Sequence, residues 1–504
     1  MARSALPALI RRRLAAEVGR IDKQAPFRIA LAYPSPYRAG MSSLGYLQIY
    51  KNIQAEEGMA CERAFLGDDA ASEGLTPLTY EGQRPLSDYP VIALSVAYEL
   101  ELAGVVKLLE AAGLPSLREE RDARSPIILA GGPLTFSNPL PLAAFADVIV
   151  MGEADTLAIE VLRVLRETPD RDEALRALAA MPHVFVPAHH GDAMPTVAQC
   201  DDDLLPAWAP IRTPEAELSD MFLIETERGC SRGCTYCVMR RSTNGGMRVV
   251  DHHKVLSLVP DEARKVGLVG AAVSDHPKIV EIVRALAEQK KTVGLSSLRP
   301  DRLSDDFVGA LALAGYKTLT TAMDGASERL RDTLERRARP RHLEKAAALA
   351  RAHGMNRLKL YLMIGVPTET DADIDECVAF TTALSKVIPV ALGIAPFCPK
   401  RNTPLAGASF AGVDVVSHRL DRLRKGLRGR VEVRSTSARW AWIEAVLAQG
   451  GLAEGRAVRE AVHRGGSFAA YEKAFLALAA PGARATKARR ALPLVSPPDE
   501  LEAP

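Results

Sequence analysis

The sequence predicts an α/β protein with two parallel-sheet regions followed by a small helical region. Strand-like and helix-like segments alternate from residue 25 to about residue 430, which is typical of parallel sheets whose strands are joined by helices. A chain of 504 residues is also too long for one ordinary domain. After about Arg430 the pattern becomes helical. The final ~20 residues, rich in Pro, Ala and basic side chains, favour disorder.

Residues 1–24 favour an N-terminal helical segment, and residues 25–170 a doubly wound, Rossmann-like domain. Strand patterns occur in "FRIALAYPSPY", in "YPVIALSV" and twice within "SPIILAGGPLTFSNPLPLAAFADVIVMGEAD", and a helical pattern follows each region. In open sheets of this kind, ligands bind at the carboxyl ends of the strands. That rule points to the loops at residues 33–40, 95–99, 131–138 and 152–155.

Residues 171–215 carry several prolines and acidic residues, so we expect a connector that includes some extended pieces. From residue 216 to about residue 430, six strand patterns separated by helices predict a partial (β/α)6 barrel. The strand patterns are "MFLIETE", "KVGLVGAAV", "TVGLSSL", "TLTTAM", "RLKLYLMIG" and "PVALGIAP". Residues 431–504 are expected to form the helical C-terminal region with its disordered tail.

The composition, 47% hydrophobic and 25% charged, is that of a globular protein. A formal net charge of +2 provides no global field that would recruit nucleic acid or an anionic membrane. The N-terminus lacks the long apolar core of a signal peptide, and no apolar run approaches the ~20 residues of a membrane span. We therefore expect a cytoplasmic protein, in which grouped cysteines are more typical of metal binding or catalysis than of disulfides.

Three of the seven cysteines, Cys230, Cys234 and Cys237, are grouped with the spacing C-x3-C-x2-C. These positions could form an apolar stripe on one helix face, but Gly229 and Gly233 disfavour a helix. We therefore predict a loop after the strand "MFLIETE", at the end of a barrel strand where such folds place their chemistry. The other four cysteines are expected to be small buried apolar residues.

Three thiolates suit either zinc or an iron–sulfur cluster. Structural zinc usually takes four ligands, and the nearest downstream histidines, His252 and His253, are fifteen or more residues beyond Cys237. An iron–sulfur cube can be held by three cysteines, which leaves one iron open for a further ligand. The spacing alone leaves both metals possible.

The pattern C-x3-C-x-aromatic-C, with Tyr236 before the last cysteine, resembles that of the radical S-adenosylmethionine enzymes. Five later segments resemble the second to sixth strands of that family's barrel, so that the resemblance covers roughly residues 216–425. They are "GLVGAAVSDH", "GLSSLRPDRL", "TTAMDGASERLR", "LYLMIGVPTET" and "APFCPKRNTPLAG". The resemblance implies that the three cysteines hold a [4Fe–4S] cluster whose open iron binds S-adenosylmethionine. Reductive cleavage of S-adenosylmethionine then yields a 5′-deoxyadenosyl radical.

The same resemblance implies further contacts to S-adenosylmethionine. Tyr236 would meet the adenine through its backbone, and Gly365 belongs to the glycine motif near the adenine. Polar contacts are expected from Ser296, Ser297, Arg299, Asp324 and Ser327. Each of these has an alternative role in a turn or helix cap, and "DGAS" would cap the following helix well. The family's Gly-Gly-Glu after the second strand is replaced by "GAAVSDH", and no catalytic acid or base is assigned.

The first domain resembles the cobalamin-binding branch of this family, through "AGGPLTFSNPLPLAAFADVIVMGEAD" at residues 130–155. The resemblance implies cobalamin contacts at Gly131, Gly132, Asn138, Gly152 and Glu153. The Asp-x-His-x-x-Gly motif of other cobalamin domains is missing, and residues 25–170 contain no histidine. Bound cobalamin would therefore have no histidine ligand from this domain.

These resemblances predict cobalamin-dependent methyl transfer to an unactivated carbon. One alternative is a radical enzyme without cobalamin, acting in methylthiolation, rearrangement or other C–H functionalisation. Methylthiolation enzymes of this family need a second cysteine cluster in the N-terminal domain, yet Cys61 is the only cysteine before Cys200. Another alternative is a non-catalytic zinc-binding protein. The expected partners are a small-molecule or peptide substrate and an electron donor such as flavodoxin or ferredoxin, with neither membrane nor nucleic acid.

Overall fold

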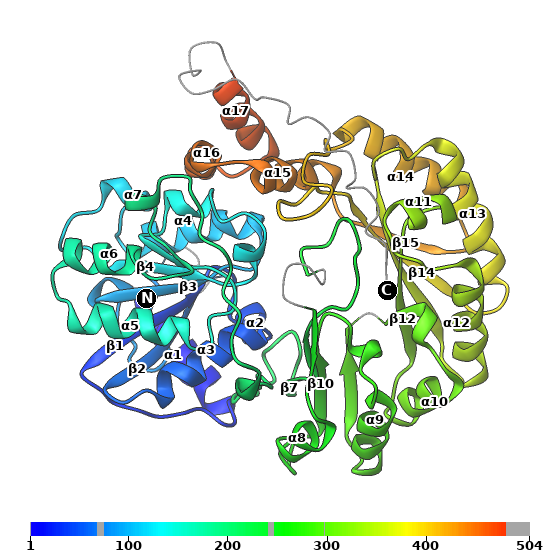
Figure 1. The fold of residues 1–504 in the computed structure, drawn as a ribbon, viewed down its shortest axis with the longest axis horizontal. Helices are drawn as coiled ribbons and strands as arrows, with labels where there is room; N and C mark the ends of the chain where they lie inside the picture. The colour runs from blue at the N-terminus through cyan, green and yellow to red at the C-terminus, as the bar shows by residue number, and fades with distance from the viewer. Residues whose placement is uncertain (1, 68–74, 240–245, 297, 480–504) are drawn as a thin grey trace, which may run out of the picture.

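A computed structural model describes residues 2–67, 75–239, 246–296 and 298–479. Ser297, Gly245 and the C-terminal tail lie outside these residues. Figure 1 shows two α/β regions side by side, one blue to cyan and one green to yellow, with the orange and red helices α15–α17 along one side. The predicted α/β class, with its two sheet regions and C-terminal helices, is confirmed.

The first region contains one six-stranded sheet with the strand order β2-β1-β3-β4-β5-β6. All neighbouring strands are parallel except β5 and β6, which pair antiparallel. The strands are β1 (Phe27–Tyr33), β2 (Met59–Phe65), β3 (Val91–Ser95), β4 (Ile127–Gly131), β5 (Val148–Val150) and β6 (Val184–Phe185). The chain reverses its winding direction between β1 and β3, and ligands of such sheets bind at this point.

Helices cover both faces of this sheet, as its buried strands require. One core cluster joins the strands to residues of α1, α3, α5 and α6, and another joins them to α4 and to the C-terminal helices. The helices of the first region are α1 (Ala2–Ala16), α2 (Tyr37–Gly40), α3 (Leu44–Ala55), α4 (Leu102–Ala111), α5 (Leu157–Glu167), α6 (Arg171–Ala179) and α7 (Pro187–His190).

The segment at residues 171–215, expected to be a connector, is partly integrated into the first domain. Helix α6 packs its Leu175 and Leu178 into the core, and β6 extends the sheet. Ala198 forms a further bridge to Gly152. The prolines and acidic residues of this segment predicted a linker. The apolar residues between them are instead buried in the first domain.

The second region contains the six predicted barrel strands and one more, divided between two parallel sheets with the orders β11-β10-β7 and β12-β13-β14-β15. A parallel bridge between Leu298 and Thr321 links the two sheets. The strands are β7 (Met221–Glu225), β10 (Lys265–Val269), β11 (Thr292–Leu295), β12 (Thr318–Asp324), β13 (Arg357–Ile364), β14 (Val390–Pro396) and β15 (Glu432–Ser435). A short antiparallel pair, β8 (Glu227–Gly229) and β9 (Met247–Val249), follows β7.

Strand β15 corrects the prediction that the chain is helical after about Arg430. It pairs with β14 over four positions and so extends the barrel sheet beyond the predicted boundary. The helices of this region are α8 (His252–Ser257), α9 (Ile279–Glu288), α10 (Asp305–Leu313), α11 (Glu328–Thr333), α12 (Pro340–Ala352), α13 (Asp371–Ser385) and α14 (Val413–Leu427).

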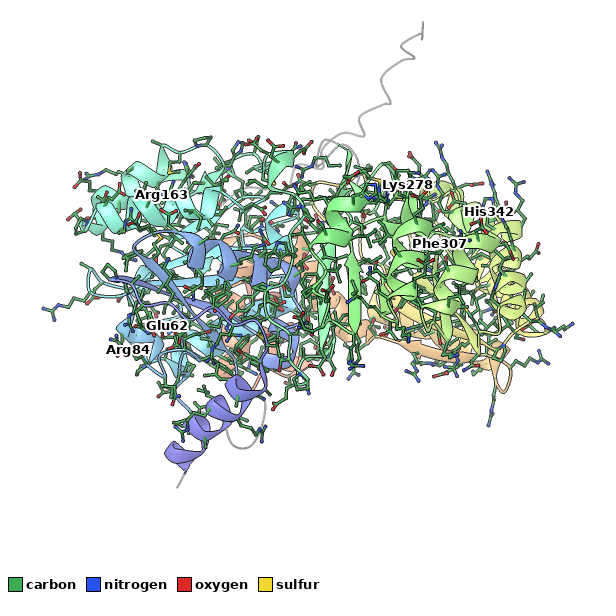
Figure 2. The ribbon with its side chains drawn as sticks, turned by 90° about the horizontal axis from the view of Figure 1, so that it is seen from below. Glu62, Arg84, Arg163, Lys278, Phe307 and His342 are labelled. Carbon is green, nitrogen blue, oxygen red and sulfur yellow. The ribbon has the colours of Figure 1, made fainter. Side chains whose placement is uncertain are left out.

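The C-terminal helices pack on the first domain rather than standing apart from it. They are α15 (Ala438–Gln449), α16 (Leu452–His463) and α17 (Phe468–Ala479). Their apolar residues, such as Leu447 and Val458, share one core cluster with Val105 and Leu109 of α4. Figure 2 gives a second view, in which Glu62 of the first domain and Phe307 of the barrel mark the two regions. Among the described residues, no helix combines the length and the apolar character needed to cross a membrane.

Candidate functional site: a cysteine loop and two cavities

The three clustered cysteines lie on an irregular segment after β8, as the glycines around them predicted. Gly229 has a φ of +81°, which turns the chain directly before Cys230. The backbone N–H of Thr235 donates to the carbonyl of Leu334 at 3.1 Å, and Leu405 N–H donates to the carbonyl of Thr235 at 3.3 Å. Segments that follow β12 and β14 therefore hold the loop at the carboxyl end of the barrel strands.

Cys230, Cys234 and Cys237 border one cavity of about 170 Å³. The other residues around this cavity are Arg232, Tyr236, Met239, Ala271, Ala272, Arg299, Ala322, Asp324 and Arg336. Within the described residues, the only metal-type group with all its ligand atoms within 4.8 Å of one another is Glu153, Asp155 and Cys200. At least one distance between the three cysteine sulfurs therefore exceeds 4.8 Å, whereas tetrahedral zinc with ~2.3 Å bonds would bring its sulfur ligands to ~3.8 Å. A cluster of several iron atoms fits this wider spacing better than a single ion does.

Burial favours the protonated form of two of these thiols when no metal is bound. It raises the pKa of Cys237 to about 11 and also raises the pKa of Cys230. Metal binding to such a set releases protons, because thiolates are the ligands.

Tyr236, Asp324 and Arg336 form one wall of the cysteine cavity. Asp324 ends β12 with a φ of +64°, and its carboxylate lies 2.5 Å from the guanidinium of Arg336. The side chains are 13% and 12% exposed, so this ion pair is largely shielded from water. Burial and the nearby Asp324 raise the pKa of Tyr236, which keeps the phenol neutral. The left-handed backbone at a non-glycine residue is a strained feature of the kind that occurs at functional sites.

Arg299, a predicted S-adenosylmethionine contact, also lines the cysteine cavity, and its side chain is 6% exposed. Its Nη2 donates to both carboxylate oxygens of Asp301, at 2.9 and 2.7 Å. Although burial opposes it, this pairing lowers the pKa of Asp301. The two hydrogen bonds thereby hold the guanidinium in place at the edge of the cavity.

Three other residues that were predicted to contact S-adenosylmethionine are hydrogen-bonded within the protein and do not border the cysteine cavity. Ser296 Oγ donates to the carbonyl of Gly270 at 3.3 Å. Ser327 is the N-cap of α11, where its Oγ accepts from Leu330 N–H and donates to Asp373 at 2.5 Å. Ser327 thus has the helix-capping role that the sequence indicated as the alternative to a cofactor contact. Gly365, with a φ of +80°, donates its N–H to Glu369 at 2.6 Å.

A second and larger cavity, of about 310 Å³, lies at the carboxyl edge of the first sheet. The predicted cobalamin contacts Gly131, Gly132 and Gly152 line it, together with Gly45 and Phe136. Its walls are mostly apolar, which is typical of ligand sites of about 300–1,000 Å³. In the described part of the chain, none of the residues that line it is a histidine.

Asn138 was predicted to contact cobalamin, but in the structure its side chain binds another part of the chain. Its side chain is fully buried, and its Nδ2 donates to the carbonyls of Leu447, Ala448 and Gly450 at 3.2, 3.1 and 2.9 Å. These carbonyls end helix α15, so Asn138 caps a helix that lies about 310 residues later in the chain. It is not among the residues that line the larger cavity.

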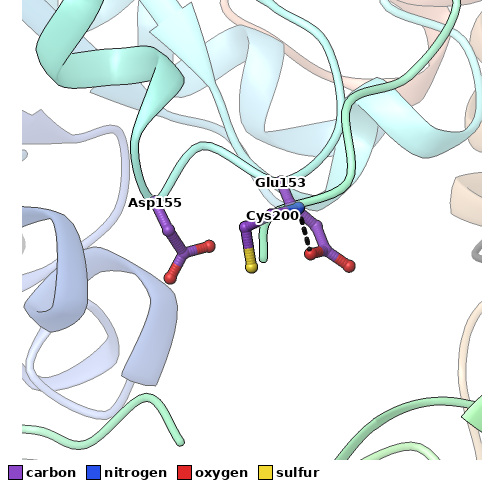
Figure 3. A group of neighbouring side chains, drawn as sticks. All are labelled: Glu153, Asp155 and Cys200. Carbon is purple, nitrogen blue, oxygen red and sulfur yellow. Dashed lines mark hydrogen bonds between the residues drawn. The ribbon is translucent and has the colours of Figure 1, made fainter. Parts of the chain in front are cut away.

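Glu153, Asp155 and Cys200 lie close together, as Figure 3 shows, and the two carboxylates among them border the larger cavity. A guanidinium already lies among them, because Arg228 Nη1 is 2.7 Å from Asp155, 3.3 Å from Glu153 and 3.1 Å from the Cys200 sulfur. Arg248 also pairs with Glu153. The group is thus an ion-pair network rather than a metal site, and the Glu153 carboxylate is engaged with protein groups.

The two cavities meet at Met239, which lines both of them. Arg228, which borders the larger cavity, is also only two residues before Cys230. The cysteine loop and the edge of the first sheet therefore border two adjacent cavities that share Met239.

The sequence prediction missed Met239, Arg228 and Arg336. Met239 and Arg228 immediately flank the cysteine motif, so their closeness in the sequence was an available signal. Arg336 lies about 100 residues after Cys234, and nothing in its local sequence distinguishes it from the neighbouring arginines.

Two family models match this chain. The model for radical SAM proteins, N-terminal, matches residues 45–187, and the model for the radical SAM superfamily matches residues 224–381. Together they span the larger cavity's loops and the cysteine loop.

Two curated proteins are similar in sequence. An uncharacterized protein of Methanocaldococcus jannaschii is 28% identical over 387 residues, which are 76% of this chain and 80% of that protein. The tRNA-2-methylthio-N(6)-dimethylallyladenosine synthase of Aquifex aeolicus is 28% identical over 195 residues, which are 36% of this chain and 43% of that enzyme.

Two solved structures show weaker likenesses. OxsB, a cobalamin-dependent S-adenosylmethionine radical enzyme with aqua-cobalamin and S-adenosylmethionine bound, has a TM-score of 0.49 and 15% identity over 70% of this chain and 51% of its own. Coproporphyrinogen III oxidase of Escherichia coli has a TM-score of 0.31 and 11% identity over 41% of this chain and 51% of its own. At these TM-scores the two structures do not bear on the function of this chain.

Proposed function

We propose, from the premise that this chain is a radical S-adenosylmethionine enzyme with that family's N-terminal domain, that it methylates an unactivated carbon with the help of cobalamin. One observation carries this proposal. The cavity of the three cysteines and the cavity at the edge of the first sheet share Met239, so that two cofactors would face one substrate space.

The residues around the smaller cavity fit a [4Fe–4S] cluster with S-adenosylmethionine. Cys230, Cys234 and Cys237 would hold the cluster, because three soft sulfur ligands border one space too wide for a single ion. Asp324 and Arg299 would face the polar groups of S-adenosylmethionine. When bound, the two groups supply a 5′-deoxyadenosyl radical that takes a hydrogen atom from carbon.

The larger cavity fits a broad, largely apolar ligand. Its floor is the carboxyl edge of a parallel sheet, and a Cβ on Gly45 would meet no atom within 4 Å. The loops of Gly131 and Gly152 come close to the cavity without side chains of their own. These features support cobalamin, which when bound would supply the transferred methyl group, and the chain would offer it no imidazole.

The chain's own residues would position the substrate and exclude water. Met239 separates the two cavities with a flexible apolar side chain, and the charged network around Arg228 closes the larger cavity on the side of the barrel. A substrate carbon near Met239 would then lie between the two cofactors. Electron transfer to the cluster would need a reductant, for which we propose a protein such as flavodoxin or ferredoxin.

The alternative of methylthiolation has one supporting observation, the similarity to the tRNA-methylthiolating enzyme over 36% of this chain. A second cluster for that chemistry would need further cysteines in the first domain. Cys61 lies fully buried on β2, and burial raises its pKa. The described cysteines of the first domain therefore favour the methylation proposal.

Anaerobic reconstitution with iron, sulfide and hydroxocobalamin tests this proposal. We expect about four iron atoms and about one cobalt atom per chain, and production of 5′-deoxyadenosine from S-adenosylmethionine. Cys234→Ser should lose iron and 5′-deoxyadenosine together. Cys398→Ser, which changes a half-buried cysteine outside the site, is the matched control and should retain both.

Each outcome addresses a separate part of the proposal. Iron without cobalt would leave a radical enzyme and overturn the cobalamin part. Production of 5′-deoxyadenosine that survives Cys234→Ser would overturn the cluster assignment. A colourless chain loaded with zinc would overturn both.

A further inference from the structure

Asp275 lies on the turn after β10, and its carboxylate contacts segments that follow two other strands. Its Oδ2 accepts hydrogen bonds from Ser231 Oγ at 3.2 Å and from Arg232 Nε at 3.1 Å. Its Oδ1 accepts from Arg302 Nε at 3.2 Å and lies 3.3 Å from Arg299 Nε. The side chain is only 3% exposed. One buried carboxylate thus joins three loops at the carboxyl end of the barrel.

The two contacts on Oδ2 fall inside the cysteine motif. Ser231 and Arg232 lie between Cys230 and Cys234, and this part of the loop has no helix or strand to fix it. A hydroxyl and a guanidinium that share one oxygen give this stretch a defined position. The turn of Asp275 is itself fixed, because Asp275 N–H donates to the carbonyl of Ala272 at 2.7 Å.

The two contacts on Oδ1 orient arginines around the same site. Arg299 borders the cysteine cavity and also an adjoining polar cavity of about 190 Å³, and Arg232 borders both as well. The neighbouring Ser274 strengthens this arrangement, since its Oγ accepts from Arg299 N–H at 3.1 Å. Asp275 places a negative charge among the guanidinium groups of Arg232, Arg299 and Arg302. Without that charge, the mutual repulsion of these positive groups would be less well offset.

We propose that Asp275 is a positioning residue for the cysteine loop, which holds Ser231 and Arg232 in place and directs Arg299 toward the cofactor cavity. It acts through these side chains and does not itself border either cavity. The proposal rests on the proposed function, namely on a cluster held by Cys230, Cys234 and Cys237. Groups that orient metal ligands from outside typically change metal affinity or activity by 10- to 100-fold when they are removed.

The test compares Asp275→Asn with Asp301→Asn in the full-length reconstituted chain. Both variants remove one negative charge near Arg299 and Arg232, since Asp301 also lies 3.9 Å from Arg232, but only the first removes the carboxylate oxygen that accepts the hydrogen bonds of Ser231 and Arg232. We expect both to make the reduction potential of the cluster more positive, because each removes a negative charge near it. Only Asp275→Asn should lose iron to a chelator about 10-fold faster and change the electron paramagnetic resonance line shape.

A second variant covers the case in which Asp275→Asn does not fold. Arg232→Met removes the loop's side of the contact at a side chain that is 26% exposed, and we expect it also to speed the loss of iron. Arg232→Lys keeps the charge but not the geometry of Nε, so it should give an intermediate rate. Iron loss at the wild-type rate in Asp275→Asn or Arg232→Met would overturn the positioning role alone. A wild-type chain that takes up no iron would overturn the proposed function and this inference together.

Discussion

Gly45 borders the larger cavity at a point where a side chain would enter open space. It lies in the first turn of α3, and a Cβ there would meet no atom within 4 Å. Gly132 differs, because it has a φ of +108° and a Cβ there would come within 2.7 Å of the carbonyl oxygen of Val96. Gly45 is therefore a position at which bulk can be added to the cavity without breaking a turn.

Gly45→Leu should block a cobalamin-sized ligand while the domain stays folded. Overfilling a packed space costs about 1–3 kcal/mol, so we expect the affinity for hydroxocobalamin to fall by about 5- to 150-fold. The fold should not suffer, since leucine favours a helix over glycine by up to ~1 kcal/mol. A spectroscopic titration of the reconstituted chain measures the affinity, and Gly45→Ala is the control with a single added methyl group. Full affinity in the leucine variant would place cobalamin outside this cavity.

At the scale of elements, Glu369 ties the end of β13 to helix α14. Its Oε2 accepts from Gly365 N–H at 2.6 Å and from Arg419 Nη1 at 2.9 Å, while its Oε1 is buried without a partner. Burial raises the pKa of Glu369 from 4.5 to about 7, despite Gly365 and Arg419. The glycine motif predicted from the sequence is thus held by a carboxyl group whose pKa is raised by burial.

This carboxyl predicts a defined dependence of stability on pH. Because the folded chain binds the proton more tightly than the unfolded chain, the free energy of unfolding should fall as the pH rises from about 4.5 to about 7. The contribution is on the order of 3 kcal/mol. Burial also raises the pKa of Glu227 to about 7, so the wild-type slope alone does not isolate Glu369.

Denaturant unfolding at pH 5 and at pH 8 checks this expectation in two variants. Glu369→Gln should lose less stability than the wild type between the two pH values, because the amide cannot ionise. Glu376→Gln changes an exposed residue of helix α13, which begins shortly after Glu369, and should follow the wild type. Equal slopes in the wild type and Glu369→Gln would show that Glu369 is ionised throughout.

Elements defined by local patterns were predictable from the sequence, and those defined by distant partners were not. The six barrel strands and the cysteine loop have clear apolar runs and glycine turns, and the structure contains them. Strand β15 has the sequence "EVRS", whose strand character comes only from pairing with β14. Asn138 follows a motif for a ligand loop, but its amide caps α15, a partner that no local pattern indicates.

At the scale of the whole molecule, Lys400 joins three parts of the chain. Its Nζ lies 2.6 Å from Glu99 in the first domain and 2.7 Å from Glu444 in α15, while Lys400 itself follows β14 of the barrel. Glu99 is 2% exposed, and burial raises its pKa against the opposing effect of Lys400. Since both α/β regions border the larger cavity, contacts that fix their relative position also fix the shape of the site.

Lys400→Met should therefore destabilise the chain far more than the loss of a surface ion pair would. Removing one partner of a buried pair costs about 3–5 kcal/mol, because the remaining charge is left uncompensated, whereas an exposed pair contributes about 0–1 kcal/mol. Lys278→Met, which breaks the exposed pair with Glu281, is the matched control. The double variant Lys400→Met with Glu99→Gln should regain part of the loss, because it leaves no buried charge. Denaturant unfolding of the three variants measures the loss in the free energy of unfolding. An equal loss in Lys400→Met and Lys278→Met would mean that Lys400 does not hold the three parts together.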